Sequence, residues 1–180
     1  MQAKSTPPPS QPVPTHRPFP PVYLRAMRAD DREPLLAILR ATREFKASEV
    51  PVAEELLDAF LDQPLTSGYY VWVALEEGQS RRRGYVCFGP TPLTEGTWDI
   101  YWIVVETSSR GMGIGRKLLQ HAEEEIGGTG GRMILVETSS KDNYRETRRF
   151  YTSMGYREIG SIADFYAPGD GKITFQKLLR

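Results

Sequence analysis

The chain has 180 residues, and its 23 lysines and arginines balance 23 aspartates and glutamates, so the formal net charge is zero. This length suits one domain with its own core, and the neutral charge argues against a protein that mainly grips nucleic-acid phosphates. Its single cysteine, Cys87, excludes a disulfide framework and a thiolate zinc site. No apolar run approaches the ~20 residues of a membrane helix, and no secretory signal is evident. We therefore expect a cytoplasmic protein that binds neither membranes nor nucleic acid.

The first 21 residues differ from the rest because they hold eight of the 14 prolines. Proline fixes φ and lacks an N–H group, so this segment cannot join a helix or a central strand. We expect Met1–Pro21 to be a disordered leader and residues 22–180 to form the folded domain. A PxxP-type ligand for a groove domain is the alternative interpretation of residues 18–21.

Hydrophobic periodicity predicts the elements of the body in chain order. Strands are expected at 22–27, 68–77, 81–89, 97–105, 132–140, 158–167 and 172–179. Helices are expected at 30–44, 52–63, 114–126 and 144–155. The first helix should open on a capping box formed by Asp30 and Glu33. The strands joined by the third helix should pair in parallel and the hairpins antiparallel, which predicts a mixed α/β sheet with helices on both faces.

A glycine loop, Arg110–Gly115, follows a predicted central strand and opens the next helix. Its three alternating glycines let backbone N–H groups approach one point, and the helix start adds unpaired donors and partial positive charge. With Arg116 and Lys117 beside it, the loop predicts a pyrophosphate site, although a plain turn with no ligand is the alternative. It is not a Walker A loop, because Leu118 replaces the required hydroxyl residue. It also departs from the dinucleotide fingerprint, whose third glycine would fall at residue 116.

The motif V-x₄-R-G-x-G-x-G, formed by Val105 and Arg110–Gly115, is similar to the acyl-CoA loop of the GNAT N-acetyltransferase superfamily. FYTSMGY at 150–156 resembles the LYxxLGF motif of the same family, and the element order agrees over 22–180. The resemblance implies a seven-stranded, mostly antiparallel sheet, splayed between the strands at 97–105 and 132–139. Acetyl-CoA would lie in that cleft and pass its acetyl group directly to a primary amine in a ternary complex.

The resemblance also implies which residues hold the acetyl-CoA. They are Val104, Val105, Arg110, Gly111, Met112, Gly113, Ile114, Gly115, Arg116, Lys117 and Tyr144. Tyr144 stands where many members have an asparagine that touches the pantetheine arm, so it departs from the family pattern.

Acetylation of an amine needs a base that removes a proton from the amine and an acid that protonates the leaving thiolate. Glu137 matches the base of ribosomal-protein-type members and is the first candidate, and Asp99 matches the base of histone-type members. By the same resemblance, Tyr151 is the acid. A packing role for each of these side chains is the alternative.

Asp99 is unusual as a carboxylate in an apolar strand, because burying an uncompensated charge is costly. Since strand side chains alternate, it should share a face with Tyr101, Ile103 and Val105. Acidic and aromatic side chains at this end suit a cationic acceptor. The family resemblance implies that the C-terminal hairpin walls the acceptor site, which is therefore expected to be lined by Tyr101, Asp164 and Tyr166.

The sequence also bears on metals, partners and the alternative function. His16 and His121 lack a ligand pattern, so no metal is expected. The alternative function is a GNAT-like domain that binds acyl-CoA and regulates a partner without turnover. The identity of the amine, the acyl chain length and the oligomeric state, with a homodimer among the options, stay open.

Overall fold

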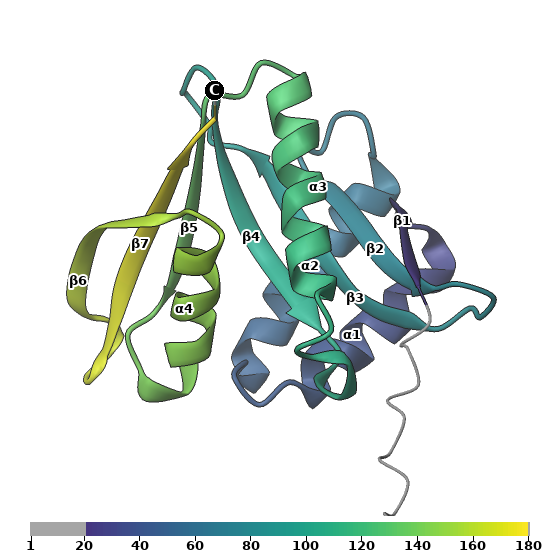
Figure 1. Cartoon of the computed structure of the whole chain (residues 1–180), viewed down its shortest axis with the longest axis horizontal. Coiled ribbons are helices and arrows are strands. Elements are labelled where there is room, and N and C mark those ends of the chain that lie inside the picture. Colours follow the sequence, from purple (N-terminus) through teal and green to yellow (C-terminus); the bar gives the residue numbers. More distant parts are fainter. Residues whose placement is uncertain (1–20, 180) are drawn as a thin grey trace, which may run out of the picture.

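Within residues 21–179, which the computed structural model describes, the chain folds into one sheet of seven strands (Figure 1). The strands lie in the order β1-β2-β3-β4-β5-β7-β6. Their bounds are Val22–Ala26 (β1), Tyr70–Glu76 (β2), Arg82–Pro90 (β3), Thr97–Val105 (β4), Met133–Ser139 (β5), Arg157–Ala167 (β6) and Asp170–Leu178 (β7). Only β4 and β5 pair in parallel, so the expected mixed, mostly antiparallel sheet is confirmed. Of the predicted leader, residues 1–20 lie outside the described residues.

Four α-helices in this part of the chain cover the sheet, two on each face (Figure 1). α1 (Arg32–Ala41) and α2 (Val50–Asp62) pack on one face, and α3 (Ile114–Gly128) and α4 (Arg145–Ser153) on the other. Short 3₁₀ turns are found at Ala29–Asp31 (η1), Ala47–Glu49 (η2), Thr107–Ser109 (η3) and Asp142–Tyr144 (η4). No helix among residues 21–179 is long and apolar enough to cross a membrane.

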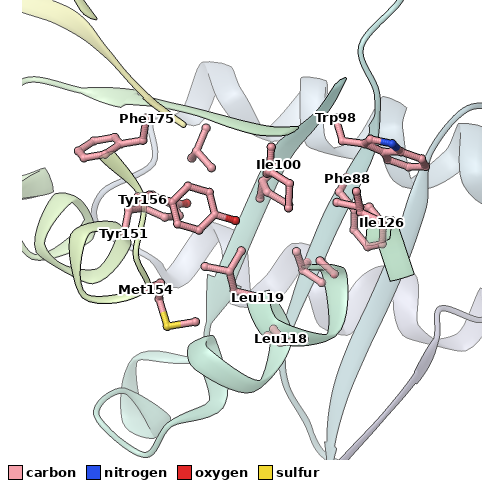
Figure 2. Packing of buried hydrophobic residues seen from close by; sticks show 14 of the residues in the cluster. Phe88, Trp98, Ile100, Leu118, Leu119, Ile126, Tyr151, Met154, Tyr156 and Phe175 are labelled. Atoms are coloured by element: carbon pink, nitrogen blue, oxygen red, sulfur yellow. The ribbon is translucent and has the colours of Figure 1, made fainter. Parts of the chain in front are cut away.

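Each pair of helices buries its own apolar core against the sheet. In α3, Leu118, Leu119 and Ile126 recur at helical spacing and are fully buried. They share one core with Tyr151 of α4 and Phe175 of β7, as Figure 2 shows. This core therefore joins the half of the molecule that contains β4 and α3 to the half that contains β5, α4 and β7.

The sheet opens between β4 and β5. The two strands pair only over Thr97–Ile100 and Met133–Val136, after which each keeps its other neighbour and they separate (Figure 1). The predicted splay is confirmed. Its consequence is that the C-terminal halves of both strands leave a gap that side chains and loops must line.

A β-bulge interrupts β4. Trp102 pairs with Cys87 and Ile100 pairs with Phe88, so Tyr101 is an extra residue without a partner. An extra residue reverses the alternation of side chains beyond it. Ile103 and Val105 consequently pack on the α3 face, together with Ile100, whereas Trp102 and Val104 face α1 and α2.

The bulge corrects one prediction about the strand face of Asp99. Trp98 and Ile100 belong to the α3 core, so Asp99 between them points to the opposite, α1 and α2 side of the sheet. Ile103 and Val105 lie on the other side, and the prediction that Asp99 shares their face is wrong.

The first helix is shorter than expected. The capping carboxylate is Asp31, not Asp30: its Oδ2 accepts a hydrogen bond from the N–H of Arg28 at 2.8 Å. Asp31 is also fully buried between the guanidinium groups of Arg25 and Arg82. These contacts form the turn η1, so α1 begins after it. The helix ends at Ala41 instead of residue 44, where Thr42 takes an extended backbone conformation. The residues released from the helix form a loop that reaches the functional site.

Candidate active site

A cavity of about 1240 Å³ occupies the place where β4 and β5 separate. One wall consists of the end of β4 and the start of α3, and the other of β5 and α4. The segment between α1 and α2, residues 42–49, completes the lining together with Tyr166 and Asp170 of the β6–β7 hairpin. The cavity thus gathers segments that are far apart in the sequence.

Buried charges hold the connection between β4 and α3. Arg83 of β3 is only 6% exposed and forms an ion pair with Glu76. Its Nη1 also donates to Glu106 Oε2 at 2.8 Å and to the Oγ of the fully buried Ser109 at 3.3 Å. This network ties β3 to the turn η3, and loss of one member would leave a buried charge uncompensated.

Two glycines then turn the chain into α3. Gly111 and Gly113 have φ of 76° and 80°, in the left-handed region where a Cβ is disfavoured. Among residues 21–179, no atom beyond the adjacent residues lies within 4 Å of the position that a Cβ would take at either glycine. Helix starts have N–H groups without an intrahelical partner and carry partial positive charge. The loop thus offers the cavity an arrangement suited to a phosphate or diphosphate.

Most of the predicted acetyl-CoA residues line this cavity. Those that do are Val104, Val105, Arg110, Gly111, Gly113, Ile114, Gly115, Arg116 and Tyr144. Met112 does not, and its side chain is 46% exposed. Lys117 is also outside the cavity, because its position on α3 directs its ammonium group to the carbonyl oxygen of Val22 in β1. Met112 and Lys117 thus lie outside the cavity lining, and their contact with the donor stays a prediction.

The loop after α1 contributes contacts that the sequence prediction missed. The carboxylate of Glu44 accepts two hydrogen bonds from the Arg110 guanidinium, at 2.6 and 3.0 Å. The backbone carbonyl of Glu44 accepts a third from the hydroxyl of Tyr144, at 2.5 Å. The hydrogen bonds from Arg110 hold the pKa of Glu44 below its usual range. Glu44 thus contacts both walls of the cavity.

The two candidate bases lie in the same cavity but in different surroundings. Burial raises the pKa of Asp99, and the negative charge of Glu137 raises it further, against a hydrogen bond from Thr91 Oγ1 at 2.6 Å. Glu137 is half-exposed, and its Oε1 accepts a hydrogen bond from Lys172 Nζ at 2.7 Å. Asp99 is therefore a half-buried carboxylate whose pKa is raised by its surroundings, whereas Glu137 is a half-exposed carboxylate in an ion pair with Lys172.

Three tyrosines from different elements also line the cavity. Tyr151 is 4% exposed, and burial raises its pKa, so its hydroxyl keeps its proton at neutral pH. Burial raises the pKa of Tyr101 to about 12, and its ring contacts Tyr69 edge-on at 5.5 Å. Burial also raises the pKa of Tyr166, and the negative charge of Glu137 raises it further. These side chains combine a proton donor with aromatic surfaces.

Asp164 does not belong to this set. The backbone of Asp164 has a φ of 54°. Its Oδ1 accepts a hydrogen bond from the N–H of Gly169 at 2.7 Å, within the β6–β7 hairpin. It does not line the cavity. Its carboxylate shapes the turn of the hairpin, and a contact of Asp164 with the acceptor stays a prediction.

The acidic group that the hairpin does contribute is Asp170, which the sequence analysis did not single out. Its side chain is 2% exposed and accepts a hydrogen bond from Ser139 Oγ at 2.5 Å. It also pairs with the ammonium groups of Lys46 at 2.9 Å and Lys141 at 3.4 Å. The Ser139 bond and these cations lower the pKa of Asp170 to about 2. Asp170 thereby ties the hairpin to the end of β5 and to the loop after α1.

Two other kinds of chemistry receive no support from the described residues. Cys87 is fully buried, and burial raises the pKa of its thiol, so it is no accessible nucleophile. Among residues 21–179, no group of three or more His, Cys, Asp or Glu side chains is arranged to hold a metal ion.

Comparison with known proteins places this site in a family. The family model of the acetyltransferase (GNAT) domain matches residues 67–158. A GNAT-family protein from Desulfovibrio desulfuricans has 36% identity and a TM-score of 0.83, over 88% of this chain and 99% of that chain. No curated protein sequence matches the chain.

More distant solved structures share the fold. An aminoglycoside 6'-N-acetyltransferase complexed with coenzyme A has 20% identity and a TM-score of 0.67, over 87% of this chain and 96% of that chain. The ribosomal-protein-S18-alanine N-acetyltransferase from Escherichia coli has 16% identity and a TM-score of 0.69, over 87% and 93%. Together with the domain match and the 36% identical relative, they lead to one conclusion: this chain belongs to the GNAT acetyltransferase family.

Proposed function

We propose that the protein is an N-acetyltransferase that transfers an acetyl group from acetyl-CoA to a primary amine by direct attack. The observation that carries the proposal is one cavity that contains the glycine loop, a half-buried carboxylate and a buried tyrosine. Membership of the family and a relative's complex with coenzyme A support the choice of donor.

The glycine loop fits the diphosphate of acetyl-CoA. The space beside Gly111 and Gly113 is open where a side chain would intrude, and the start of α3 supplies N–H donors. Arg43, Arg110 and Arg116 also line this cavity. Guanidinium groups bind phosphate oxygens through paired hydrogen bonds, so this end of the cavity suits an anionic donor.

Besides binding the donor, the site needs acid–base chemistry, which Asp99 and Tyr151 can supply. Attack by a neutral amine forms the N–C bond at the thioester carbonyl and breaks the C–S bond. In our proposal Asp99 accepts the proton of the amine, and Tyr151 donates a proton to the departing thiolate. The different surroundings of the two carboxylates favour Asp99 as the base over Glu137, which the sequence had placed first. Glu137 then acts through its charge on Asp99 and on the acceptor.

A cationic amine is the acceptor class that these side chains suit. Asp99 and Glu137 come from the two separated strands, and Tyr101 and Tyr166 add aromatic faces on which an ammonium group can rest. Attraction of a protonated amine and removal of its proton then use the same carboxylates. Relatives of the same fold are named for aminoglycoside and ribosomal-protein acceptors, both of which offer amines.

Acetyl-CoA should stabilise the folded protein, whereas NAD and ATP should not. At a concentration of about 100 times its Kd, a ligand that binds only the folded state contributes about 2.7 kcal/mol. For a chain of this size that raises the melting temperature by roughly 5 to 10 °C. Thermal unfolding of the full chain with each compound tests this. An equal shift with ATP or NAD, or none with acetyl-CoA, would refute the assignment of the donor.

A further inference from the structure

We infer that Glu44 sets the affinity for acetyl-CoA by competing with its phosphates for Arg110. The inference rests on the proposed function, since it concerns the donor end of the same cavity. Glu44 belongs to neither the glycine loop nor the acid–base set. Its carboxylate, which lies on the loop after α1, must release the Arg110 guanidinium when the phosphates of an anionic substrate bind there.

The segment Glu44–Lys46 crosses the cavity and is held at both walls. On the α3 side, the Glu44 carboxylate binds Arg110 through two hydrogen bonds. On the other side, the Glu44 carbonyl accepts from Tyr144 of η4, and Lys46 pairs with Asp170 of β7. Glu44, Lys46 and their three partners all line the cavity. The segment Glu44–Lys46, called the strap below, therefore lies along the space that a substrate would use.

The Glu44–Arg110 contact uses the donors that a phosphate would need. A guanidinium has five N–H groups in a fixed plane, and a two-point pair with a carboxylate occupies one edge of it. The pair is formed by side chains that are 21% exposed at Glu44 and 42% exposed at Arg110, so water screens it only in part. A phosphate that binds the same edge of Arg110 displaces Glu44, and the loss of that pair is subtracted from the binding free energy.

The anchors at the two walls differ in how a substrate would affect them. The bond from Tyr144 goes to the backbone of Glu44, and the Lys46–Asp170 pair lies on the hairpin side. Neither involves the glycine loop. Exchange of Arg110 from Glu44 to a phosphate would therefore release the strap from the α3 wall while the opposite wall keeps it. Acetyl-CoA binding and the position of the loop beside the acceptor end would be linked in this way.

Calorimetric titration of acetyl-CoA into Glu44→Gln tests the competition. The substitution removes the charge and leaves the backbone carbonyl that Tyr144 uses. We expect acetyl-CoA to bind about threefold to tenfold more tightly, the range of a partly exposed two-point ion pair. Arg110→Gln should bind more weakly than wild type, and Glu44→Gln should add nothing in that background. Glu55→Gln, a neutralised glutamate on the exposed face of α2, should leave Kd unchanged and controls for net charge.

The outcomes separate the inference from the proposed function. An unchanged Kd in Glu44→Gln overturns the inference, and so does weaker binding, which would mean that Glu44 orients Arg110 for the phosphate. The same gain in the Arg110→Gln background would also overturn it, because the effect would not pass through Arg110. If wild type does not bind acetyl-CoA, the proposed function fails instead. Thermal unfolding of the single and double variants without ligand then reports whether Glu44 and Arg110 are coupled.

Discussion

Replacement of Asp99 by asparagine should lower kcat for the best amine acceptor by about 100-fold or more at neutral pH, the usual scale for loss of a general base. Asparagine keeps the shape of the side chain and its contact with Thr91 but cannot accept the proton of the amine. Acetyl-CoA affinity should stay unchanged, because Asp99 belongs to the acid–base end of the cavity. Raising the pH should restore part of the rate, since more of the amine is then already neutral.

Glu137→Gln provides the comparison. Its negative charge raises the pKa of Asp99, so its removal lowers that pKa and increases the fraction of Asp99 that is ionised at low pH. The acid limb of the kcat profile should therefore move to lower pH, with a smaller loss of kcat at neutral pH than in Asp99→Asn. Profiles of kcat against pH for both variants measure this. Asp62→Asn, at the exposed end of α2, is the matched control and should behave as wild type.

The reverse result would change the assignment. If Asp99→Asn turns over normally and Glu137→Gln has lost its activity, the base is Glu137, as the sequence suggested. If both variants keep the full rate on the best acceptor, a carboxylate base is excluded for this protein.

Gly113→Asp should weaken acetyl-CoA binding by about 2 kcal/mol or more, which corresponds to about a 30-fold rise in Kd. Gly113 is the N-cap of α3 and lines the cavity, and the position of its missing Cβ is open. An aspartate there would place a negative charge at the helix start, where the phosphates of the donor would bind. Calorimetry with acetyl-CoA measures the change.

Gly113→Asn separates charge from strain. Asparagine has the size of aspartate and tolerates the left-handed backbone better than most residues, so the two variants share the strain at a φ of 80°. The asparagine variant should bind acetyl-CoA clearly more tightly than the aspartate variant. Equal affinities of the two would attribute the loss to strain or bulk, and wild-type affinity in Gly113→Asp would remove the phosphate site from this loop.

The features that the sequence predicted well are those with a local signature. The glycines at 111 and 113 indicate a turn with left-handed backbone conformation, and the helix that follows them has a periodic apolar face. The parallel pairing across α3 follows from the crossover connection, and the seven strands follow from alternation and turn residues. The family resemblance added the splay between β4 and β5, which no local pattern contains.

What the sequence could not predict depends on tertiary contacts. The bulge at Tyr101 leaves no local signal, yet it changes which residues share a face with Asp99. The pairing of Glu137 with Lys172 joins residues 35 positions apart and altered the choice of base. Glu44 was expected only as the last residue of a helix and Asp170 was not singled out, because their partners come from distant elements. Asp164 was assigned from its charge and from the family resemblance of its hairpin, whereas the structure uses that charge within the hairpin itself.

The most direct test of acetyl transfer is incubation of the full chain with acetyl-CoA that carries a labelled acetyl group and a panel of amines. The panel should include a polyamine, an aminoglycoside, a peptide with a free N-terminus and a lysine peptide. Mass spectrometry should find the label on at least one amine, in amounts equal to the CoA released, and Asp99→Asn should transfer at least about 100-fold more slowly. Tight binding of acetyl-CoA with no labelled amine and no CoA release would contradict the enzyme assignment and favour a domain that binds acyl-CoA without turnover.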